Sequence, residues 1–464
     1  MKILVLSESP KNQTSVTLNT LRILEKMTTF STKDEFTELL VGNGFYKDNV
    51  SEEIRKADFV IFCSSLFHFF VPTEVISFLD EMEKHIGQDL ENKPVTFFST
   101  SSLLMDGEAH AYMKRRLTKM GARYIRGLSL RDYSVLSPEG REEMANWFHY
   151  ARSYALGEDE RFKDDKCQVV FIDATDGTNQ KINESMQKVE AEFYNLGVGM
   201  VKKFALRDYK INQCQACTYC YSMDECMIKD DFKPLTEQVY PNTDIIVTFG
   251  ELQDGLLGKT HKVWLDRHVK FGLHPTEEEI IFSYVIDSSK AGKYDKFAMN
   301  IHEMALGNFN KNYHLGIWDS EDMQSLSEMC EDAVKAYNYE LYPQSNMYSQ
   351  GANFIFKKIA WNIQKMAPKN YEFYAKNKGY ALPEVNPNMR RFNNPKEARE
   401  SQKHRLTPYK MTLAGTNEDV ALKTKRRVNN MWNKPQDVKM QKYEERQSLL
   451  ARLIEKIRSI FKKD

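Results

Sequence analysis

Four cysteines lie close together in the sequence and are the clearest candidates for chemistry. The segment holds four of the seven cysteines within 13 residues: Cys214, Cys217, Cys220 and Cys226. The other three stand alone along the chain: Cys63, Cys167 and Cys330. The N-terminus has too short an apolar run for a secretory signal, so we expect a cytoplasmic protein whose thiols stay reduced. The cluster therefore predicts metal ligation rather than disulfides.

A second candidate site lies near the N-terminus, in a loop rich in hydroxyl and turn-forming residues. The candidate ligand-binding residues of this loop are Ser7, Ser9, Pro10, Lys11, Asn12, Thr14 and Ser15. A phosphate monoester needs N–H donors, short O–H donors and the positive end of a helix dipole, and a loop of this type before a helix supplies all three. The alternative is an ordinary capped turn between a strand and a helix.

Two later segments add residues suited to a flat ligand. One places aromatic residues beside small hydroxyls: Ser64, Ser65, Leu66, Phe67, His68 and Phe69. The other supplies further donors: Thr100, Ser101 and Ser102. Aromatic side chains pack well against a planar heterocycle, although a core aromatic cluster is the simpler reading of the first segment. Together the three segments predict a crevice for a phosphorylated planar ligand.

These segments follow short apolar runs that alternate with helical periodicity, the pattern of a parallel α/β sheet. Five strands are expected in the first part of the chain: 3–6, 36–41, 59–63, 95–99 and 124–128. Five more are expected further on: 169–172, 199–204, 245–249, 280–285 and 314–318. We therefore predict two flavodoxin-like, doubly wound five-stranded sheets, whose ligands bind beyond the carboxyl ends of the strands.

The two sets of strands are related as an internal repeat. The segment from Asp58 aligns without a gap on the segment from Asp244, at an offset of 186 residues. The first strands align at an offset near 166, so the second copy holds an insertion of about 20 residues. The cysteine cluster falls inside this insertion, which we place at about 207–231. The predicted domains are 1–158, 159–345 and a basic extension, 346–464.

The first copy resembles the NADPH-dependent FMN reductases, a flavodoxin-like superfamily. The resemblance rests on Ser7, Ser9, Pro10, Lys11, Thr14 and Ser15, on Ser64 and Phe67, and on the run Phe78, Leu79, Asp80. It implies FMN as cofactor and NAD(P)H as electron donor. The copy departs from the family pattern at Glu8, Cys63 and Ser65. Glu8 places an anion next to the proposed phosphate.

The second copy resembles the iron-sulfur flavoproteins of that superfamily. The resemblance covers the stretch from Leu206 to Asp231 and implies that the four cysteines ligate a [4Fe-4S] cluster. A cuboidal cluster needs four thiolates around one small centre, which a short loop with two-residue spacers can supply. Zinc and unmetallated redox thiols remain the alternatives, although structural zinc sites usually draw on two separated pairs of cysteines.

The copies differ in what they retain. The second copy has the cysteines, but carboxylates at Asp173, Asp176 and Glu251 stand where a flavin phosphate would lie. We therefore expect one FMN per chain, bound by the first copy. If the copies pack as the protomers of the resembling family do, this flavin should lie close to the cluster loop of the second copy. The expected function is electron transfer between the cluster and FMN, with reduction of a small acceptor. The alternative is a non-catalytic zinc-binding or scaffold protein.

The C-terminal extension is basic, with 20 lysines and arginines against 9 aspartates and glutamates from Met389 onward. Residues 386–416 read as an extended linker, and 440–463 as an amphipathic helix. This helix could dock on the acidic body, form a homodimer or touch an anionic membrane surface, and the first two are favoured. No nucleic acid is expected, and the electron donor is either NAD(P)H or a ferredoxin-like protein.

Overall fold

A computed structural model describes most of the chain before residue 342 and parts of the remainder. It describes residues 1–341 except 10, 33, 42–46, 102–105, 159–166, 224, 269–279 and 301–312. It also describes short stretches between 355 and 397, and residues 406–415. In these parts of the chain, no helix is both long and apolar enough to cross a membrane.

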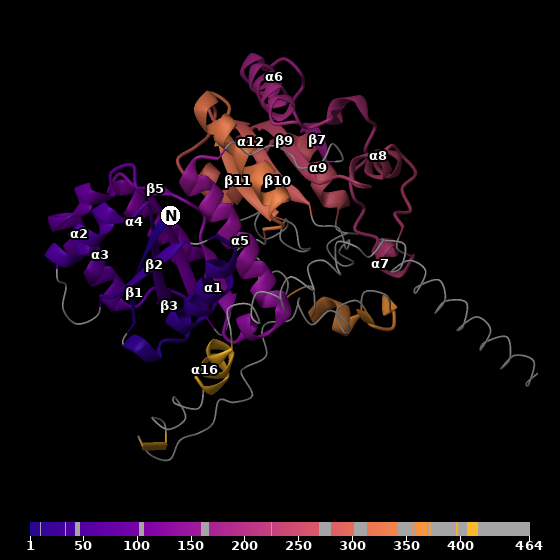
Figure 1. Cartoon of the computed structure of the whole chain (residues 1–464). Helices are drawn as coiled ribbons and strands as arrows, with labels where there is room; N and C mark the ends of the chain where they lie inside the picture. The colour runs from indigo at the N-terminus through magenta and orange to yellow at the C-terminus, as the bar shows by residue number, and fades with distance from the viewer. Residues whose placement is uncertain are drawn as a thin grey trace, which may run out of the picture.

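The first unit is a parallel sheet with helices on both faces (Figure 1). Its main strands lie in the order β2-β1-β3-β4-β5. The strands are β1 (Lys2–Glu8), β2 (Glu35–Leu40), β3 (Phe59–Ser65), β4 (Pro94–Ser101), β5 (Arg123–Tyr124) and β6 (Leu128–Arg131). The helices are α1 (Val16–Thr32), α2 (Lys47–Lys56), α3 (Thr73–His85), α4 (Gly107–Lys119) and α5 (Pro138–Leu156).

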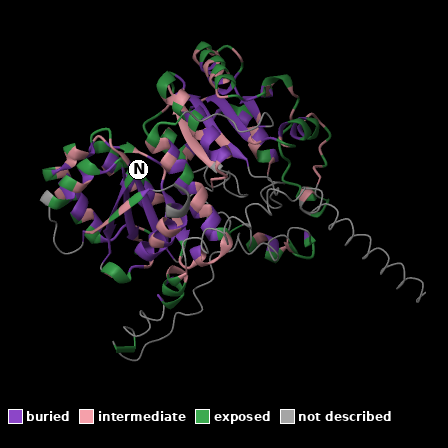
Figure 2. Cartoon of the chain, viewed as in Figure 1, coloured by how far each residue is buried: buried purple, intermediate pink, exposed green. Residues whose placement is uncertain are grey.

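Alternation along the strands builds two cores, one on each face of this sheet. On β1, Ile3 and Val5 pack with residues of α1 and α5, whereas Leu4 and Leu6 pack with residues of α2, α3 and α4. Because side chains of a strand point alternately to opposite faces, a sheet covered on both sides needs strands that are apolar throughout. Figure 2 shows the resulting buried strands beneath partly exposed helices.

The fifth strand of this sheet is split into two pieces that both pair with β4. β5 lies beside Pro94 and Val95, and β6 lies beside the end of β4 from Phe98 onward. Gly127, between the pieces, approaches β4 so closely that a Cβ there would lie 2.1 Å from the carbonyl oxygen of Phe97. The break therefore depends on a residue without a side chain.

The second unit repeats the same strand order. Its five strands are β7 (Gln168–Asp173), β8 (Met200–Ala205), β9 (Ile245–Glu251), β10 (Ile281–Asp287) and β11 (Tyr313–Asp319). They lie in the order β8-β7-β9-β10-β11, and all neighbouring pairs are parallel. The helices described here are α6 (Gln180–Asn195), α7 (Tyr219–Met223), α8 (Phe232–Val239), α9 (Gly258–Arg267) and α12 (Met323–Asn338). The prediction of two doubly wound α/β sheets is confirmed.

The two units meet where α5 and α12 contact each other. The rings of Tyr150 and Tyr339 lie 6.1 Å apart, and the Lys335 ammonium lies 4.1 Å from the ring centre of Tyr154. Burial raises the pKa of Asp332, on the same helix as Lys335, to about 6. This contact thus combines aromatic packing with cation–π attraction.

One part of the expected linker is not extended. Within 386–416, residues Thr407–Ala414 form helix α16, which lies against α1 of the first unit. Leu406 and Tyr409 are buried in the core that α1 and α5 share, and the Tyr409 hydroxyl accepts a 3.0 Å hydrogen bond from the Tyr133 backbone N–H. The linker prediction is wrong here, because two buried side chains in a polar segment suffice to anchor a short helix. The helix expected at 440–463 lies outside the described residues.

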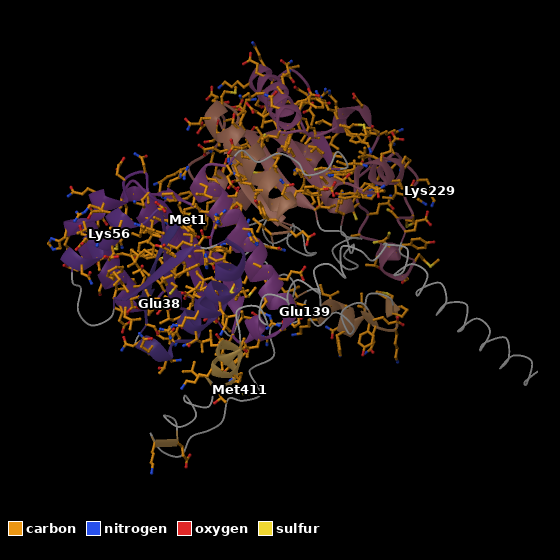
Figure 3. All side chains as sticks on the ribbon, in the orientation of Figure 1. Met1, Glu38, Lys56, Glu139, Lys229 and Met411 are labelled. Atoms are coloured by element: carbon orange, nitrogen blue, oxygen red, sulfur yellow. The ribbon has the colours of Figure 1, made fainter. Side chains whose placement is uncertain are left out.

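We expect Tyr409→Ala to lower the free energy of unfolding by about 3 kcal/mol, because it empties a fully buried aromatic site. Met411→Ala on the same helix is the matched control. Met411, labelled in Figure 3, is 72% exposed, and its loss should change stability by less than about 0.5 kcal/mol. Urea denaturation of the full chain measures both. Equal effects of the two substitutions would show that α16 is not anchored through Tyr409.

Candidate functional site

Three hydroxyl side chains join the carboxyl edge of the first sheet to α1. The Thr17 hydroxyl lies 2.8 Å from that of Ser65 and 2.7 Å from that of Thr100. Ser65 and Thr100 are neighbours in the register of β3 and β4, and Thr17 is the second residue of α1. Two predicted ligand donors, Ser65 and Thr100, are thus partners of a third hydroxyl that the sequence did not single out. The trio fixes the start of α1 over the edge of the sheet.

The loop between β1 and α1 presents a short exposed turn in front of this helix. Asn12, Gln13 and Thr14 are exposed, and Asn12 adopts a positive φ of 46°. Ser9 lies beneath them, 3% exposed, and its hydroxyl accepts a 3.3 Å hydrogen bond from the Lys11 backbone N–H. An exposed turn at a helix N-terminus is suited to an anion such as a phosphate. Pro10 lies outside the described residues.

The start of α1 is fixed by Ser15. It is fully buried, and its hydroxyl accepts a 3.5 Å hydrogen bond from the Leu18 backbone N–H. Ser7, at the end of β1, is also buried, and it forms a side-chain hydrogen bond with Cys63. These two serines therefore support the loop from within rather than presenting their hydroxyls to a ligand.

The aromatic loop after β3 forms a tight turn that carries two phenyl rings into solvent. Backbone hydrogen bonds join Phe67 and Phe70 in both directions, at 2.9 and 3.0 Å. His68 and Phe69 between them have φ values of 50° and 66°, which strains residues with side chains. Phe67 and Phe69 are each 38% exposed, so the core-cluster alternative is wrong for them. The rings are free to stack on a planar ligand.

The rest of the predicted crevice is only partly described. Ser64 is buried at the end of β3, while Leu66 is half-buried and its backbone N–H donates to the Thr100 carbonyl at 3.2 Å. Ser101 is buried at the end of β4, and its carbonyl accepts from the Asp132 N–H at 2.9 Å. Ser102 lies outside the described residues.

Glu8 is the unusual residue at this edge. It is the last residue of β1, is 3% exposed, and neither of its carboxyl oxygens has a hydrogen-bond partner among the described residues. Burial, with a smaller contribution from Glu74, raises its pKa to about 7. The exposed turn and the phenyl rings fit the phosphate and the ring system of FMN. Glu8 fits an anionic ligand only in its neutral form.

The matching edge of the second sheet has the same connections made by different side chains. The amide nitrogen of Asn179, at the start of α6, donates to carboxylate oxygens of Glu251 and Asp287, each at 2.9 Å. Glu251 and Asp287 are neighbours in the register of β9 and β10, as Ser65 and Thr100 are in β3 and β4. Asn179 thus takes the place of Thr17, and carboxylates take the place of hydroxyls.

These carboxylates make the second edge anionic. Burial opposes ionisation of Asp287, but hydrogen bonds from Asn179 and Ser289 outweigh it and lower its pKa. Asp173, at the end of β7, pairs with Arg207, and Glu251 pairs with Lys290 at 2.6 Å. A phosphate placed here would meet ionised carboxylates whose cations are already engaged.

The cysteine segment is closed at its base by a buried ion pair. Both nitrogens of the Arg267 fork donate to Asp230, at 2.8 and 3.2 Å, and both side chains are at most 3% exposed. Asp230 also accepts from the Asn212 backbone N–H at 2.8 Å, while Arg267 donates to the Asn212 carbonyl at 2.9 Å. The residues just before and after the cysteines are thereby held together on α9. No local sequence pattern indicates this pair, because Asp230 and Arg267 are 37 residues apart.

Within the segment, the other three thiols act on Cys220. Burial, and after it the neighbouring thiols of Cys226, Cys214 and Cys217 in that order, raise the pKa of Cys220 to about 11. The Ala216 backbone N–H lies 3.4 Å from the Cys214 sulfur and points at it, and Ala216 has a φ of 49°. Nevertheless, among the described residues no three His, Cys, Asp or Glu side chains are arranged to hold a metal ion. The donor chemistry fits a thiolate-bound metal, although the ligand geometry is not formed.

A cavity of about 530 Å³ lies between the cysteine segment and α9. Its lining includes Gln213, Cys214, Gln253, Lys259 and Lys262. The cavity belongs to the second unit and does not include the turn or the phenyl rings of the first.

The first unit matches a known family. Residues 1–134 match the family model of NADPH-dependent FMN reductases, which supports a flavin-dependent oxidoreductase. No curated protein matches the chain.

Solved structures match parts of the chain. The flavoenzyme NAD(P)H:(acceptor) oxidoreductase FerB from Paracoccus denitrificans is 19% identical, covering 27% of this chain and 74% of its own, with a TM-score of 0.24. General stress protein 14 from Treponema denticola, in complex with FMN, is 11% identical over 34% and 99% of the two chains, with a TM-score of 0.26. An NADPH-quinone reductase from P. pentosaceus is 13% identical over 33% and 97%, with a TM-score of 0.27.

We expect Asp230→Ala to lower the free energy of unfolding by about 3 kcal/mol, because it leaves the buried Arg267 without its counter-ion. Glu225→Gln, which removes the exposed partner of Lys229, is the matched control and should leave stability nearly unchanged, because solvent screens this pair. Urea denaturation measures stability, and limited proteolysis between residues 213 and 229 reports release of the segment. Equal stability and equal cleavage in the two variants would contradict the proposed role of the ion pair.

Proposed function

We propose that the chain is a flavin-dependent oxidoreductase that binds one FMN at the carboxyl edge of the first sheet and takes electrons from NAD(P)H. The observation that carries the proposal is the family match of residues 1–134, which contain the exposed turn, the hydroxyl trio and the phenyl rings. Bound FMN would supply hydride and single-electron chemistry to a small acceptor.

The residues of the first unit would bind and orient the cofactor. The exposed turn at Asn12, Gln13 and Thr14 would receive the phosphate, assisted by the dipole of the 17-residue helix α1. Phe67 and Phe69 would cover one side of the planar ring system and exclude water from it. The hydroxyl trio would keep α1 in place while the ligand binds.

The second unit, we propose, is a copy of the first that has exchanged flavin binding for metal binding, with boundaries near residues 158 and 345. Two observations support a tandem repeat: the shared strand order, and the equivalent bridges made by Thr17 and Asn179. The carboxylates at its edge argue against a second flavin.

The cysteines would hold a [4Fe-4S] cluster. Three observations support a thiolate-bound centre: the three thiols that act on Cys220, the N–H directed at the Cys214 sulfur, and the closed base of the segment. Zinc remains the rival occupant, and with it a non-catalytic scaffold role. Anaerobic purification separates the two functions, because a brown protein with flavin absorption is expected for the first and a colourless zinc protein for the second.

The two proposed cofactor sites are not adjacent within one chain. Figure 1 shows α1 within the first unit and α7, in the cysteine segment, at the far end of the second unit. The expectation that the cluster loop lies close to the flavin is therefore wrong for a single chain. Electron transfer between the sites would need a second copy of the chain or a mobile carrier.

Cys220→Ala should lose bound iron and keep its flavin, because Cys220 lies among the other three thiols. Iron and flavin are measured on the same anaerobically purified sample. Cys330→Ala is the control, since Cys330 is buried in the core of the second unit and should keep both. Full iron in Cys220→Ala would exclude it as a ligand.

Flavin quantitation should give about one FMN per chain. Ser9→Asp should abolish binding, because it adds an anion beneath the phosphate turn, whereas Thr175→Asp, near the edge of the second sheet, should leave the stoichiometry unchanged. Two flavins per chain, or loss of flavin in Thr175→Asp alone, would contradict the assignment to the first sheet.

A further inference from the structure

Glu8 is a buried carboxyl group without a partner. Among the described residues it is the one acidic side chain with both carboxyl oxygens buried and unbonded. A buried carboxylate without compensating hydrogen bonds or a cation is strongly disfavoured, so the neutral acid is the form that this site accepts. The burial-induced rise of its pKa to about 7 agrees with this geometry.

The position of Glu8 connects it to the proposed phosphate site. It ends β1, pairs in register with Ser64 of β3, and is followed by Ser9 beneath the exposed turn. Strand alternation places it on the face of Leu4 and Leu6, toward α3. The titratable group that acts on it is Glu74, in the first turn of α3, and Glu8 in turn raises the pKa of the Cys63 thiol on β3. Neither is a cation that would stabilise an ionised Glu8.

We propose that Glu8 must hold a proton for FMN to bind, so that binding of the flavin phosphate is coupled to the uptake of one proton. When Glu8 is ionised in the free protein, it takes up one proton from solution as one FMN binds, and in the complex Glu8 is neutral. A neutral carboxyl donates a hydrogen bond, whereas a carboxylate beside a phosphate dianion repels it. This inference rests on the proposed function of the first unit, and Glu8 is a specificity-determining residue within it.

The sign of the pH dependence follows from this balance. Below about pH 7, Glu8 is already protonated in the free protein and adds no pH dependence. Above about pH 7, each pH unit should weaken FMN binding by up to about tenfold, because the proton must be taken from solution. The second ionisation of the phosphate, near pH 6, is complete over this range and does not contribute.

The test is a titration of the flavin-free full chain with FMN at pH values from about 6 to about 9. Quenching of the flavin fluorescence measures binding. The wild type should lose affinity above about pH 7 with the slope given above. Glu8→Gln, which keeps the shape and cannot ionise, should bind FMN with nearly constant affinity above about pH 7. Glu8→Ala is a second variant with the same expected flat profile, and circular dichroism verifies that both variants fold.

Riboflavin lacks the phosphate, so its binding shows whether the pH dependence arises from repulsion between the Glu8 carboxylate and the FMN phosphate. Its binding to the wild type should show at most a small slope above about pH 7, because no phosphate faces Glu8. Equal FMN slopes in the wild type, Glu8→Gln and Glu8→Ala would overturn the inference while leaving FMN binding intact. If none of the three proteins binds FMN at about pH 6, the proposed function fails and the inference fails with it.

Discussion

One side chain at the start of a helix ties together the third and fourth strands of each sheet. In the first unit Thr17 bonds Ser65 and Thr100, and in the second unit Asn179 bonds Glu251 and Asp287. In a parallel sheet the carboxyl ends of these strands form the edge at which ligands bind. These hydrogen bonds therefore position the loops that follow the strands. The chemistry of each edge depends on which side chains form the bonds.

The hydrogen bonds of Thr17 and those of Asn179 have opposite consequences for an anionic ligand. Three hydroxyls are neutral, and each can both donate and accept, so this trio adds no fixed charge to the first edge. Two carboxylates held by one amide keep negative charge at the second edge, even with Lys290 and Arg207 nearby. Under the proposed function, the same backbone frame would accept a phosphate in one unit and reject it in the other. Electrostatics, rather than fold, would then divide the functions.

Much of the fold could be predicted from the sequence, because strand positions follow from local apolar runs. The predicted strand 59–63 corresponds to β3, and the 186-residue offset carries Phe59–Ser65 onto Ile245–Glu251. The same offset relates the bridge between Phe67 and Phe70 to that between Gln253 and Leu256. Residues within one strand or one turn determine these features, so a single segment contains the information.

Features that join distant segments could not be predicted in this way. The sequence shows that Ser65 is a hydroxyl residue, but only the folded chain brings it to Thr17. It also gives no indication that Arg267 closes the cysteine segment or that Tyr409 enters the core of the first unit. Burial of Glu8 is a further case, since the sequence identifies it only as an anion next to the proposed phosphate.

The most direct test of the account is a crystal structure of the full chain grown with FMN. The account predicts one flavin, with its phosphate at the turn of Asn12, Gln13 and Thr14 and its ring system against Phe67 and Phe69. A flavin at the carboxyl edge of the second sheet, beside Glu251 and Asp287, would contradict it, as would a chain that crystallises with neither edge occupied at saturating FMN.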